Sequence, residues 1–271
     1  MLHLDKEKCI GCGLCIKDCW FGALSMQDGK AAADYSRCFK CGHCIAVCPK
    51  NCFELDDYGA VPSIEYQAAE FEIPAAKLLN FIKFRRTVRQ FLPKQIDKQT
   101  LSTILEAGRF TQTGGNQQNV AYIIVQDKLQ ELRKMGVEKL YALSKQLAGT
   151  TDPILKRYAG IWENMYTDYQ QDPNGADKLF LKAPTVLVIT SPAPLNAGLA
   201  AANIANMIDA TPGLGNCFSG FFTRAAAGDP AFHEFLGVKD GYQIIATMMI
   251  GYHHTKYYRT VPRKAVEINW L

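Results

Sequence analysis

The sequence predicts a two-domain protein of mixed helices and strands, in which a short cysteine-rich module precedes a larger domain. Eight of the ten cysteines lie within the first fifty residues. A chain of 271 residues is much longer than such a module needs, so its length favours a second domain. Three apolar segments of strand type alternate there with helix-favouring stretches, which indicates that both kinds of element share one core.

The cysteines form the same pattern twice, in CIGCGLCIKDCW and in CFKCGHCIAVCPK. Each cysteine of the second run lies 29 positions after its counterpart in the first. Runs of the type C-x2-C-x2-C-x3-C hold [4Fe–4S] clusters, and the fourth cysteine of each run ligates the other cluster. The repeat is therefore identified as a two-cluster, bacterial-type ferredoxin module. The two expected ligand sets are Cys9, Cys12, Cys15 and Cys48, and Cys38, Cys41, Cys44 and Cys19.

Two other uses of cysteine fit this pattern less well. Paired disulfides need an oxidising compartment, whereas the chain opens MLHLDKEK without an apolar signal segment, so we expect a cytoplasmic protein. Structural zinc uses two C-x2-C pairs, which leaves the third and fourth cysteine of each run unexplained. Trp20 stands where the second run has Pro49, a difference expected to alter the packing and potential of the cluster bound by Cys19.

Composition and charge exclude two classes of partner. No uninterrupted apolar stretch approaches the roughly 18 residues of a membrane span, although 48% of the residues are hydrophobic. The formal net charge of +4 is offset by two oxidised clusters, about −4 together, and by a phosphate monoester of up to about −2. We therefore expect neither membrane insertion nor nucleic-acid binding.

The predicted domains are a ferredoxin module over residues 1–57, a linker over 58–73 and a larger domain over 74–271. Pro74 is expected to open a helix with an apolar stripe, and a second helix is expected over 98–110. Residues 120–125, 185–190 and 243–250 read as buried strands, and residues 196–210 as an alanine-rich helix. The aromatic residues of the helix-favouring stretch 128–182 either cover the active site as a lid or pack between two amphipathic helices.

Four patches of the larger domain carry candidate binding residues. FRRTVRQF, residues 84–91, supplies three arginines and a threonine that match phosphate oxygens, although a solvated helix end has a similar composition. TQTGGNQQN, residues 111–119, is a glycine-containing loop with amide side chains, or an ordinary turn. PGLGNCFSGF, residues 212–221, follows a helix that Gly213 is expected to cap. The fourth patch is the basic terminal arm, residues 251–271.

Taken together, these patches resemble those of the FMN-dependent nitroreductase family over roughly residues 75–271. The resemblance implies FMN-phosphate binding by Arg85, Arg86, Thr87 and Arg89, with Thr87 in place of the family's serine. It implies flavin contacts in the family's PSxxNxQPW-like loop, where Asn119 and Val120 replace the usual Pro-Trp. It places the segment containing Ser219 and Gly220 beside flavin N5 and assigns a phosphate contact to Arg263 and Lys264. The loop residues that match are Thr113, Gly114, Asn116 and Gln118.

The same resemblance implies the fold and the assembly. It implies an α+β fold with an antiparallel-rich sheet flanked by helices, and a homodimer with flavin at the interface. The C-terminal arm would reach across to the partner subunit. As a whole, the chain is similar to the ferredoxin–nitroreductase fusion proteins of anaerobic bacteria.

The expected activity is the reduction of a small, electron-poor acceptor, aromatic or nitro, with electrons from reduced ferredoxin or a similar donor. Flavin chemistry needs no protein nucleophile, and no Ser/His/Asp arrangement is visible. Neither a G-x-G-x-x-G fingerprint nor a Walker A motif is present. His43 is expected to be a surface or hydrogen-bonding residue, and Cys217 to pack as a small buried side chain. The alternative function is an electron-transfer relay or redox sensor whose acceptor is another protein.

Overall fold

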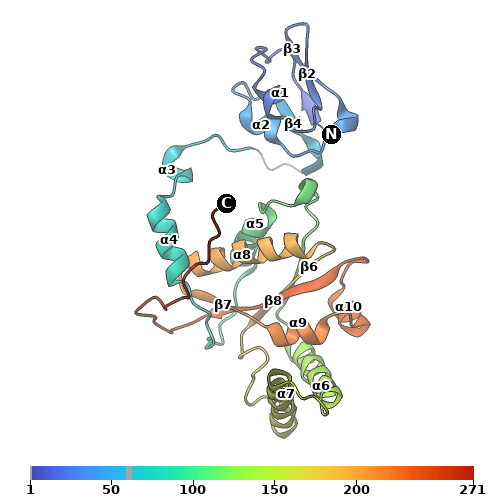
Figure 1. Cartoon of the computed structure of the whole chain (residues 1–271), viewed down its shortest axis with the longest axis vertical. Coiled ribbons are helices and arrows are strands. Elements are labelled where there is room, and N and C mark those ends of the chain that lie inside the picture. Colours follow the sequence, from blue (N-terminus) through green and yellow to red (C-terminus); the bar gives the residue numbers. More distant parts are fainter. Residues whose placement is uncertain (1, 59–62) are drawn as a thin grey trace. The chain divides into compact units, whose positions relative to one another are not determined.

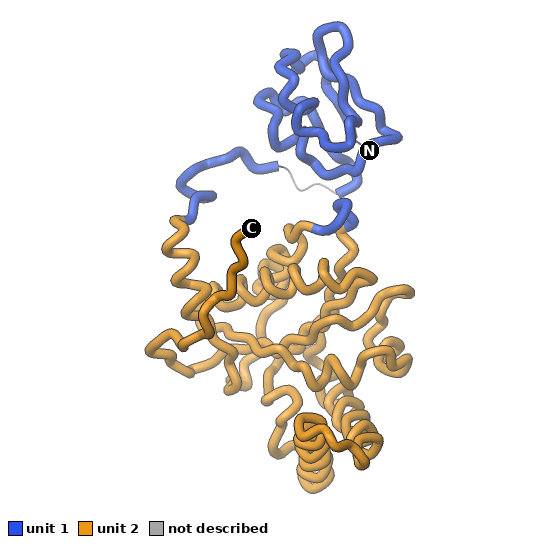
Figure 2. The backbone as a smooth tube through the Cα atoms, in the orientation of Figure 1, with its two compact units in different colours: residues 1–73, 113–117 blue, residues 74–112, 118–271 orange. Residues whose placement is uncertain are grey.

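The structure is a computed structural model that describes residues 2–58 and 63–271. The chain forms two compact units (Figure 2), one made of residues 1–73 with 113–117 and the other of 74–112 with 118–271. The division therefore falls immediately before Pro74. Residues 59–62 of the predicted linker lie outside the described residues.

The first unit is built from short elements that follow the cysteine repeat (Figure 1). α1 and α2 begin 29 positions apart, and each is preceded by a glycine with positive φ, Gly13 at 72° and Gly42 at 77°. The turn Asp28-Gly29 has positive φ at both residues, which suits a two-residue hairpin between β2 and β3. The elements are β1 (Leu2–Leu4), α1 (Leu14–Asp18), β2 (Leu24–Gln27), β3 (Lys30–Ala33), η1 (Tyr35–Arg37), α2 (His43–Val47), β4 (Phe53–Leu55), η2 (Asp56–Tyr58), α3 (Ala68–Phe71) and η3 (Gly114–Asn116).

The second unit contains a four-stranded sheet and seven helices within the described residues. Aspartates begin several of the helices: Asp97 accepts from the Thr100 amide at 2.8 Å, and Asp152 accepts from the Ile154 amide at 2.7 Å. The elements are α4 (Ala75–Phe84), α5 (Lys98–Arg109), β5 (Ala121–Val125), α6 (Leu129–Gln146), α7 (Pro153–Gln171), β6 (Thr185–Ser191), α8 (Pro194–Ala210), β7 (Leu214–Phe218), α9 (Gly220–Ala226), α10 (Pro230–Leu236) and β8 (Gln243–Tyr252).

The strand order of this sheet is β5-β6-β8-β7, and every neighbouring pair is antiparallel. The central strand β6 is buried along its whole length, because helices cover both faces of the sheet. Val186 and Val188 pack with α6, α7, α9 and α10, whereas Leu187 and Ile189 pack with α5 and α8. The expected α+β fold with an antiparallel sheet flanked by helices is therefore confirmed.

Most of the predicted elements occur with small changes at their ends. The three predicted strands correspond to β5, β6 and β8, and the stretch 128–182 contains the helices α6 and α7. The aromatic side chains there pack between helices: Tyr141 stacks on Tyr166 with ring centroids 4.0 Å apart, and Trp162 is 1% exposed. This arrangement matches the core-packing alternative.

The structure also differs from the sequence prediction in the region after α8. The residue that caps α8 is Thr211, so the prediction that Gly213 caps this helix was wrong. Gly213 instead has φ of 77° in the turn that leads into β7. β7, α9 and α10 were not predicted, because a glycine interrupts the first and the two helices are short.

Candidate cluster and flavin sites

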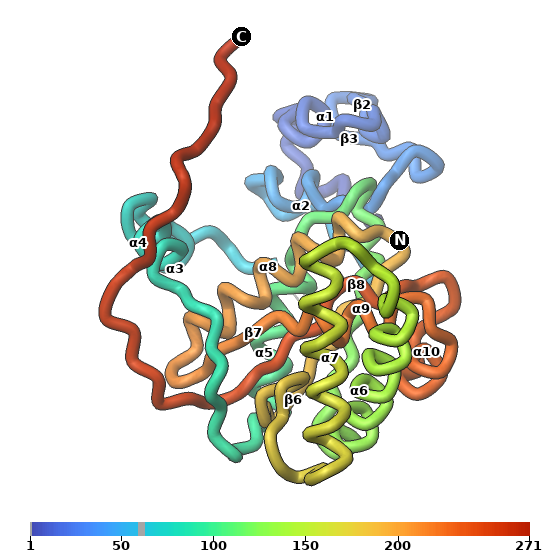
Figure 3. The backbone as a smooth tube through the Cα atoms, turned by 60° about the horizontal axis from the view of Figure 1, so that its bottom comes forward, coloured from blue at the N-terminus to red at the C-terminus, as the bar shows by residue number. Residues whose placement is uncertain are grey.

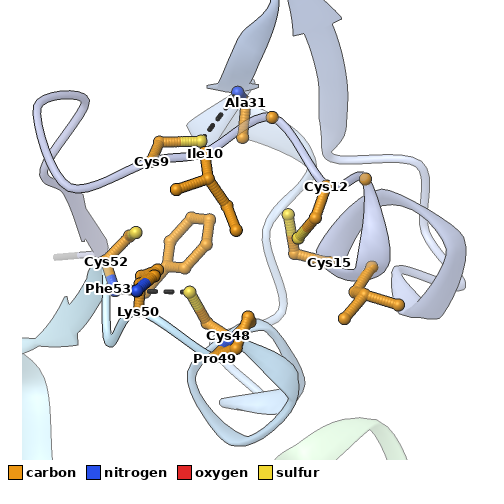
Figure 4. Close-up of a pocket in the computed structure, with 13 residues that line it drawn as sticks. Cys9, Ile10, Cys12, Cys15, Ala31, Cys48, Pro49, Lys50, Cys52 and Phe53 are labelled. Carbon is orange, nitrogen blue, oxygen red and sulfur yellow. Dashed lines mark hydrogen bonds between the residues drawn. The ribbon is translucent and has the colours of Figure 1, made fainter.

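The first candidate site is a hollow in unit 1 that is lined by Cys9, Cys12, Cys15 and Cys48 (Figure 4). The first three of these cysteines lie on the turn before α1 and at its start, and Cys48 caps the end of α2. The hollow therefore draws its thiols from both halves of the repeat.

The second hollow has the complementary composition. Cys38, Cys41 and Cys44 line it from the turn before α2 and from α2 itself, and Cys19 reaches it from the end of α1. The empty space in the two hollows, counted with its part open to solvent, is similar, about 340 Å³ and 410 Å³. The structure thus brings together the two crossed sets that the cysteine spacing predicts.

Both hollows fit a [4Fe–4S] cluster in their chemistry. Backbone N–H groups point at sulfurs in each: Ala31 to Cys9 at 3.4 Å in the first, and Ala23 to Cys19 at 3.3 Å in the second. Such hydrogen bonds favour the charged thiolate that ligates iron. Within the described residues no three His, Cys, Asp or Glu side chains converge tightly enough for a single metal ion. Four thiols around a wider hollow suit a cube of iron and sulfur instead.

Without metal, the thiols differ in their protonation. Burial raises the pKa of the Cys44 thiol to about 12, and the nearby Cys38 and Cys41 act in the same direction. Hydrogen bonds from the Ala31 and Gly11 amides lower the pKa of Cys9. Because cluster ligands bind as thiolates, filling these sites releases protons.

A ninth cysteine, Cys52, also lines the first hollow, although it belongs to neither expected ligand set. Cys52 is 4% exposed, and its backbone N–H donates to Cys48 Sγ at 3.4 Å. The spacing of the repeat identifies this position. Cys52 lies 29 positions after Ala23, which has the equivalent place in the first half of the repeat.

The arginine block of unit 2 lies across the strands β7 and β8. The Val88 amide donates to the Asn216 carbonyl at 2.9 Å, and the Leu92 amide donates to the Tyr252 carbonyl at 2.8 Å. The Tyr257 hydroxyl donates to the Thr87 carbonyl at 3.2 Å. Three of the four candidate patches therefore meet: the arginine block, the glycine-rich segment and the start of the terminal arm.

A pair of glycines makes room for this crossing. Gly215 and Gly251 are cross-strand partners, so their α-carbons present the same face of the sheet. A β-carbon at Gly215 would lie 2.3 Å from Val88 Cγ2, and one at Gly251 would lie 2.9 Å from Phe91 Cδ1. Gly215 thus leaves room for the Val88 side chain.

Arg85 has a partner that the sequence analysis did not foresee. Its Nε lies 3.2 Å from Asp209 Oδ2, and the Asn216 side-chain amide donates to Asp209 Oδ1 at 3.0 Å. Burial raises the pKa of Asp209, while the Arg85 charge and the Asn216 amide act in the opposite direction. Of the block, Thr87 and Arg89 are exposed, and Arg86 is half-buried with Nε 2.5 Å from the Arg85 carbonyl.

The two residues predicted near flavin N5, Ser219 and Gly220, have different surroundings in the turn from β7 into α9. The Ser219 N–H donates to the Thr247 carbonyl at 2.8 Å, and its hydroxyl donates to the Leu179 carbonyl at 3.1 Å. Gly220 is exposed, begins α9, and has open space where a side chain would be. The first N–H groups of a helix have no partner within that helix, whereas the Ser219 N–H is already bonded to the Thr247 carbonyl.

The loop predicted to contact flavin is divided between the two units. Thr113, Gly114 and Asn116 belong to unit 1, whereas Gln118 belongs to unit 2. Within unit 1, Asn116 Nδ2 donates to the Lys40 carbonyl at 2.8 Å and to the Tyr58 hydroxyl at 3.0 Å. Asn116 therefore contacts Lys40, which lines the second cluster hollow.

The remaining candidates lie on exposed or structural positions. Arg263 and Lys264 are exposed on the extended tail after β8 (Figure 3). His43 is exposed and its Nδ1 lies 3.0 Å from Asp18 Oδ2, as expected for a hydrogen-bonding residue. Cys217 is 8% exposed, which confirms its predicted burial, and this burial raises the pKa of its thiol.

Sequence models of two known families match this chain. The Nitroreductase family model matches residues 82–252, and the 4Fe-4S dicluster domain model matches residues 1–70. No curated protein matches the chain.

Several solved structures have a fold similar to the second unit. A nitroreductase with bound FMN from Bacteroides fragilis is 20% identical, with a TM-score of 0.53 over 71% of this chain and 98% of that one. A nitroreductase with bound FMN from Desulfitobacterium hafniense is 23% identical, with a TM-score of 0.52 over 70% and 97%. An iodotyrosine deiodinase bound to FMN and 3-iodo-L-tyrosine is 17% identical, with a TM-score of 0.52 over 71% and 98%.

Proposed function

The chain belongs to the nitroreductase family and carries a 4Fe-4S dicluster domain, and on this basis we propose how the two parts cooperate. The protein is an FMN-dependent oxidoreductase that receives single electrons at two [4Fe–4S] clusters and reduces a small, electron-poor acceptor by two electrons. The observation that carries the proposal is the pair of four-cysteine hollows in the same chain as a nitroreductase domain. When bound, the clusters supply one-electron transfer, and FMN supplies both one-electron and two-electron chemistry.

The residues of unit 1 hold and tune the clusters. The crossed thiols of each hollow are the ligands, and the amides of Ala31 and Ala23 donate to their sulfurs. These fixed donors stabilise the negative charge that each cluster gains on reduction. Both hollows are lined mostly by apolar atoms, and one thiol of each, Cys12 and Cys41, is exposed.

The residues of unit 2 bind and orient the flavin. Arg86, Thr87 and Arg89 offer donors to the phosphate, because arginine forks match phosphate oxygens. Arg85 holds the block in place through its ion pair with Asp209. Gly220 begins α9 and has open space where a side chain would be, so its N–H would donate to the flavin ring.

The proposed assembly is a homodimer, which the exposed surface of unit 2 supports. The apolar stripe of α4 is uncovered, with Leu78 45% and Leu79 49% exposed. A contiguous apolar stripe on a helix is a frequent site of subunit contact. In a two-fold dimer both subunits contribute the same surface to the interface. A second copy of the chain would therefore cover this stripe with a surface that includes its own α4.

Replacing Leu78 and Leu79 with glutamate should separate the dimer. Burying a leucine side chain contributes about 1.5–3 kcal/mol, so we expect the dissociation constant to rise by at least ~100-fold. Sedimentation velocity over a concentration series measures the change. Lys77→Glu adds negative charge on the same helix and should leave the dimer intact. An unchanged dimer in the Leu78→Glu/Leu79→Glu variant would place the interface elsewhere.

The proposed electron path is tested by anaerobic stopped-flow with the full-length protein. Reduced ferredoxin, NADH and NADPH are offered separately, and the loss of oxidised-flavin absorbance is followed. We expect rapid bleaching with reduced ferredoxin. In Cys19→Ala, bleaching by ferredoxin should collapse, whereas a small chemical reductant should still reduce the flavin. Undiminished ferredoxin-driven bleaching in Cys19→Ala would show that electrons bypass the clusters.

A second measurement separates an enzyme from a relay. The reduced protein is mixed with a nitroaromatic compound over a range of concentrations, and the reoxidation rate of the flavin is recorded. A saturating dependence supports a binding site for a small acceptor. A linear dependence would favour the relay, whose acceptor is another protein.

A further inference from the structure

The first cluster hollow contains one more thiol than a [4Fe–4S] cluster needs. Besides Cys9, Cys12, Cys15 and Cys48, its wall includes Cys52. Cys52 is 96% buried, since only 4% of its surface is exposed. Cys52 therefore belongs to the apolar core of unit 1 and at the same time faces four candidate ligands.

The Cys52 side chain faces this hollow. Its sulfur points between the sulfurs of Cys9 and Cys48 (Figure 4), and all three residues line the hollow. Its backbone N–H also donates to Cys48 Sγ at 3.4 Å. Cys52 therefore contacts Cys48, an expected cluster ligand that lies four positions before it in the chain.

The second hollow provides a matched position without the thiol. Ala23 corresponds to Cys52 in the repeat, is also 4% exposed, and donates its backbone N–H to Cys19 Sγ at 3.3 Å. The backbone contact is thus the same in both hollows. The two positions differ in whether a thiol or a methyl group faces the sulfurs.

We propose that Cys52 is a positioning residue that raises the reduction potential of the cluster in the first hollow by donating its thiol proton to a sulfur there. A cluster gains one negative charge when it accepts an electron, and a donor aimed at its sulfurs stabilises that charge. The proton stays on Cys52 throughout. The inference rests on the proposed function, because it requires both clusters to be bound.

Potentiometric titration of the holoprotein, followed by electron paramagnetic resonance, tests this role. In Cys52→Ala, one of the two midpoint potentials should fall by at least ~28 mV, which is a threefold change at 59 mV per tenfold for a one-electron couple. The other midpoint should not move. Cys52→Ser keeps a hydrogen-bond donor of similar size and should restore most of the lost potential. The reverse change, Ala23→Cys, should raise the midpoint that Cys52→Ala leaves unchanged.

Iron analysis of the same samples separates this inference from the proposed function. About eight irons in each variant confirms that both clusters are bound. Unchanged midpoints in a fully loaded Cys52→Ala variant would overturn the role of Cys52 and leave the proposed function intact. A loss of about four irons in Cys52→Ala would make Cys52 a ligand and would likewise overturn it. About four irons or fewer in the unaltered protein would contradict the two-cluster proposal itself.

Discussion

Replacing Cys19 with alanine should leave about four irons per chain instead of about eight. Cys19 is the thiol that α1 contributes to the second hollow, and three ligands would remain there. Among the described residues that line this hollow there is no fifth cysteine, because Ala23 takes the position that Cys52 has in the first hollow. The variant therefore tests the loss of one ligand without a second thiol nearby. Iron analysis after anaerobic reconstitution measures the result.

Two double variants then distinguish crossed from uncrossed ligation. With crossed ligation, Cys19→Ala/Cys38→Ala removes two ligands from one hollow and should still retain about four irons. Cys19→Ala/Cys9→Ala removes one ligand from each hollow and should retain almost none. Uncrossed ligation predicts the opposite pattern. Cys217→Ala, which alters a cysteine in the other unit, serves as the control and should retain about eight irons.

Replacing both Arg86 and Arg89 with alanine should weaken FMN binding by at least tenfold, about 1.4 kcal/mol. Charge-assisted hydrogen bonds to phosphate contribute more than neutral ones, and Thr87 alone cannot replace them. The iron content should not change, because no cluster thiol lies near the block in the sequence. Flavin fluorescence titration of the apoprotein measures the affinity. Equal affinity in the variant and the parent would make the block a solvated helix end.

Arg85→Ala is the matched control within the same block. Its ion pair holds Asp209, whose side chain is 10% exposed, and removing the partner of a buried carboxylate costs about 2–3 kcal/mol. We therefore expect a lower unfolding temperature and a smaller loss of FMN affinity than in the Arg86/Arg89 variant. A large loss of affinity without a change in stability would instead place Arg85 on the phosphate.

The features that the sequence predicts well are those set by short-range spacing. The cysteine repeat determines both the turns before α1 and α2 and the grouping of their thiols. β6 is recognisable because a fully buried strand needs an unbroken apolar run. α5 is recognisable because Leu101 and Ile104 recur at helical spacing, and both are buried.

The features that the sequence does not predict depend on contacts between distant segments. Arg85 and Asp209 lie 124 positions apart, and only the packing of α4 near the end of α8 brings their side chains together. β7 lacks β-branched residues and contains a glycine, so its strand conformation follows from pairing with β8. Likewise, the apolar stripe of α4 predicts burial, yet within the described chain Leu78 and Leu79 remain exposed.

The glycine pair in β7 and β8 also limits how this protein can diverge. Because a β-carbon at Gly215 would meet Val88 at 2.3 Å, a larger residue there requires a smaller one at Val88. A β-carbon at Gly251 would meet both Pro184 Cδ at 2.8 Å and Phe91 Cδ1 at 2.9 Å, so a larger residue there requires changes at two positions. Homologues with a larger residue in place of Gly215 should therefore carry a smaller one in place of Val88, and a mutant library that randomises Gly215 should recover function only when Val88 is randomised too.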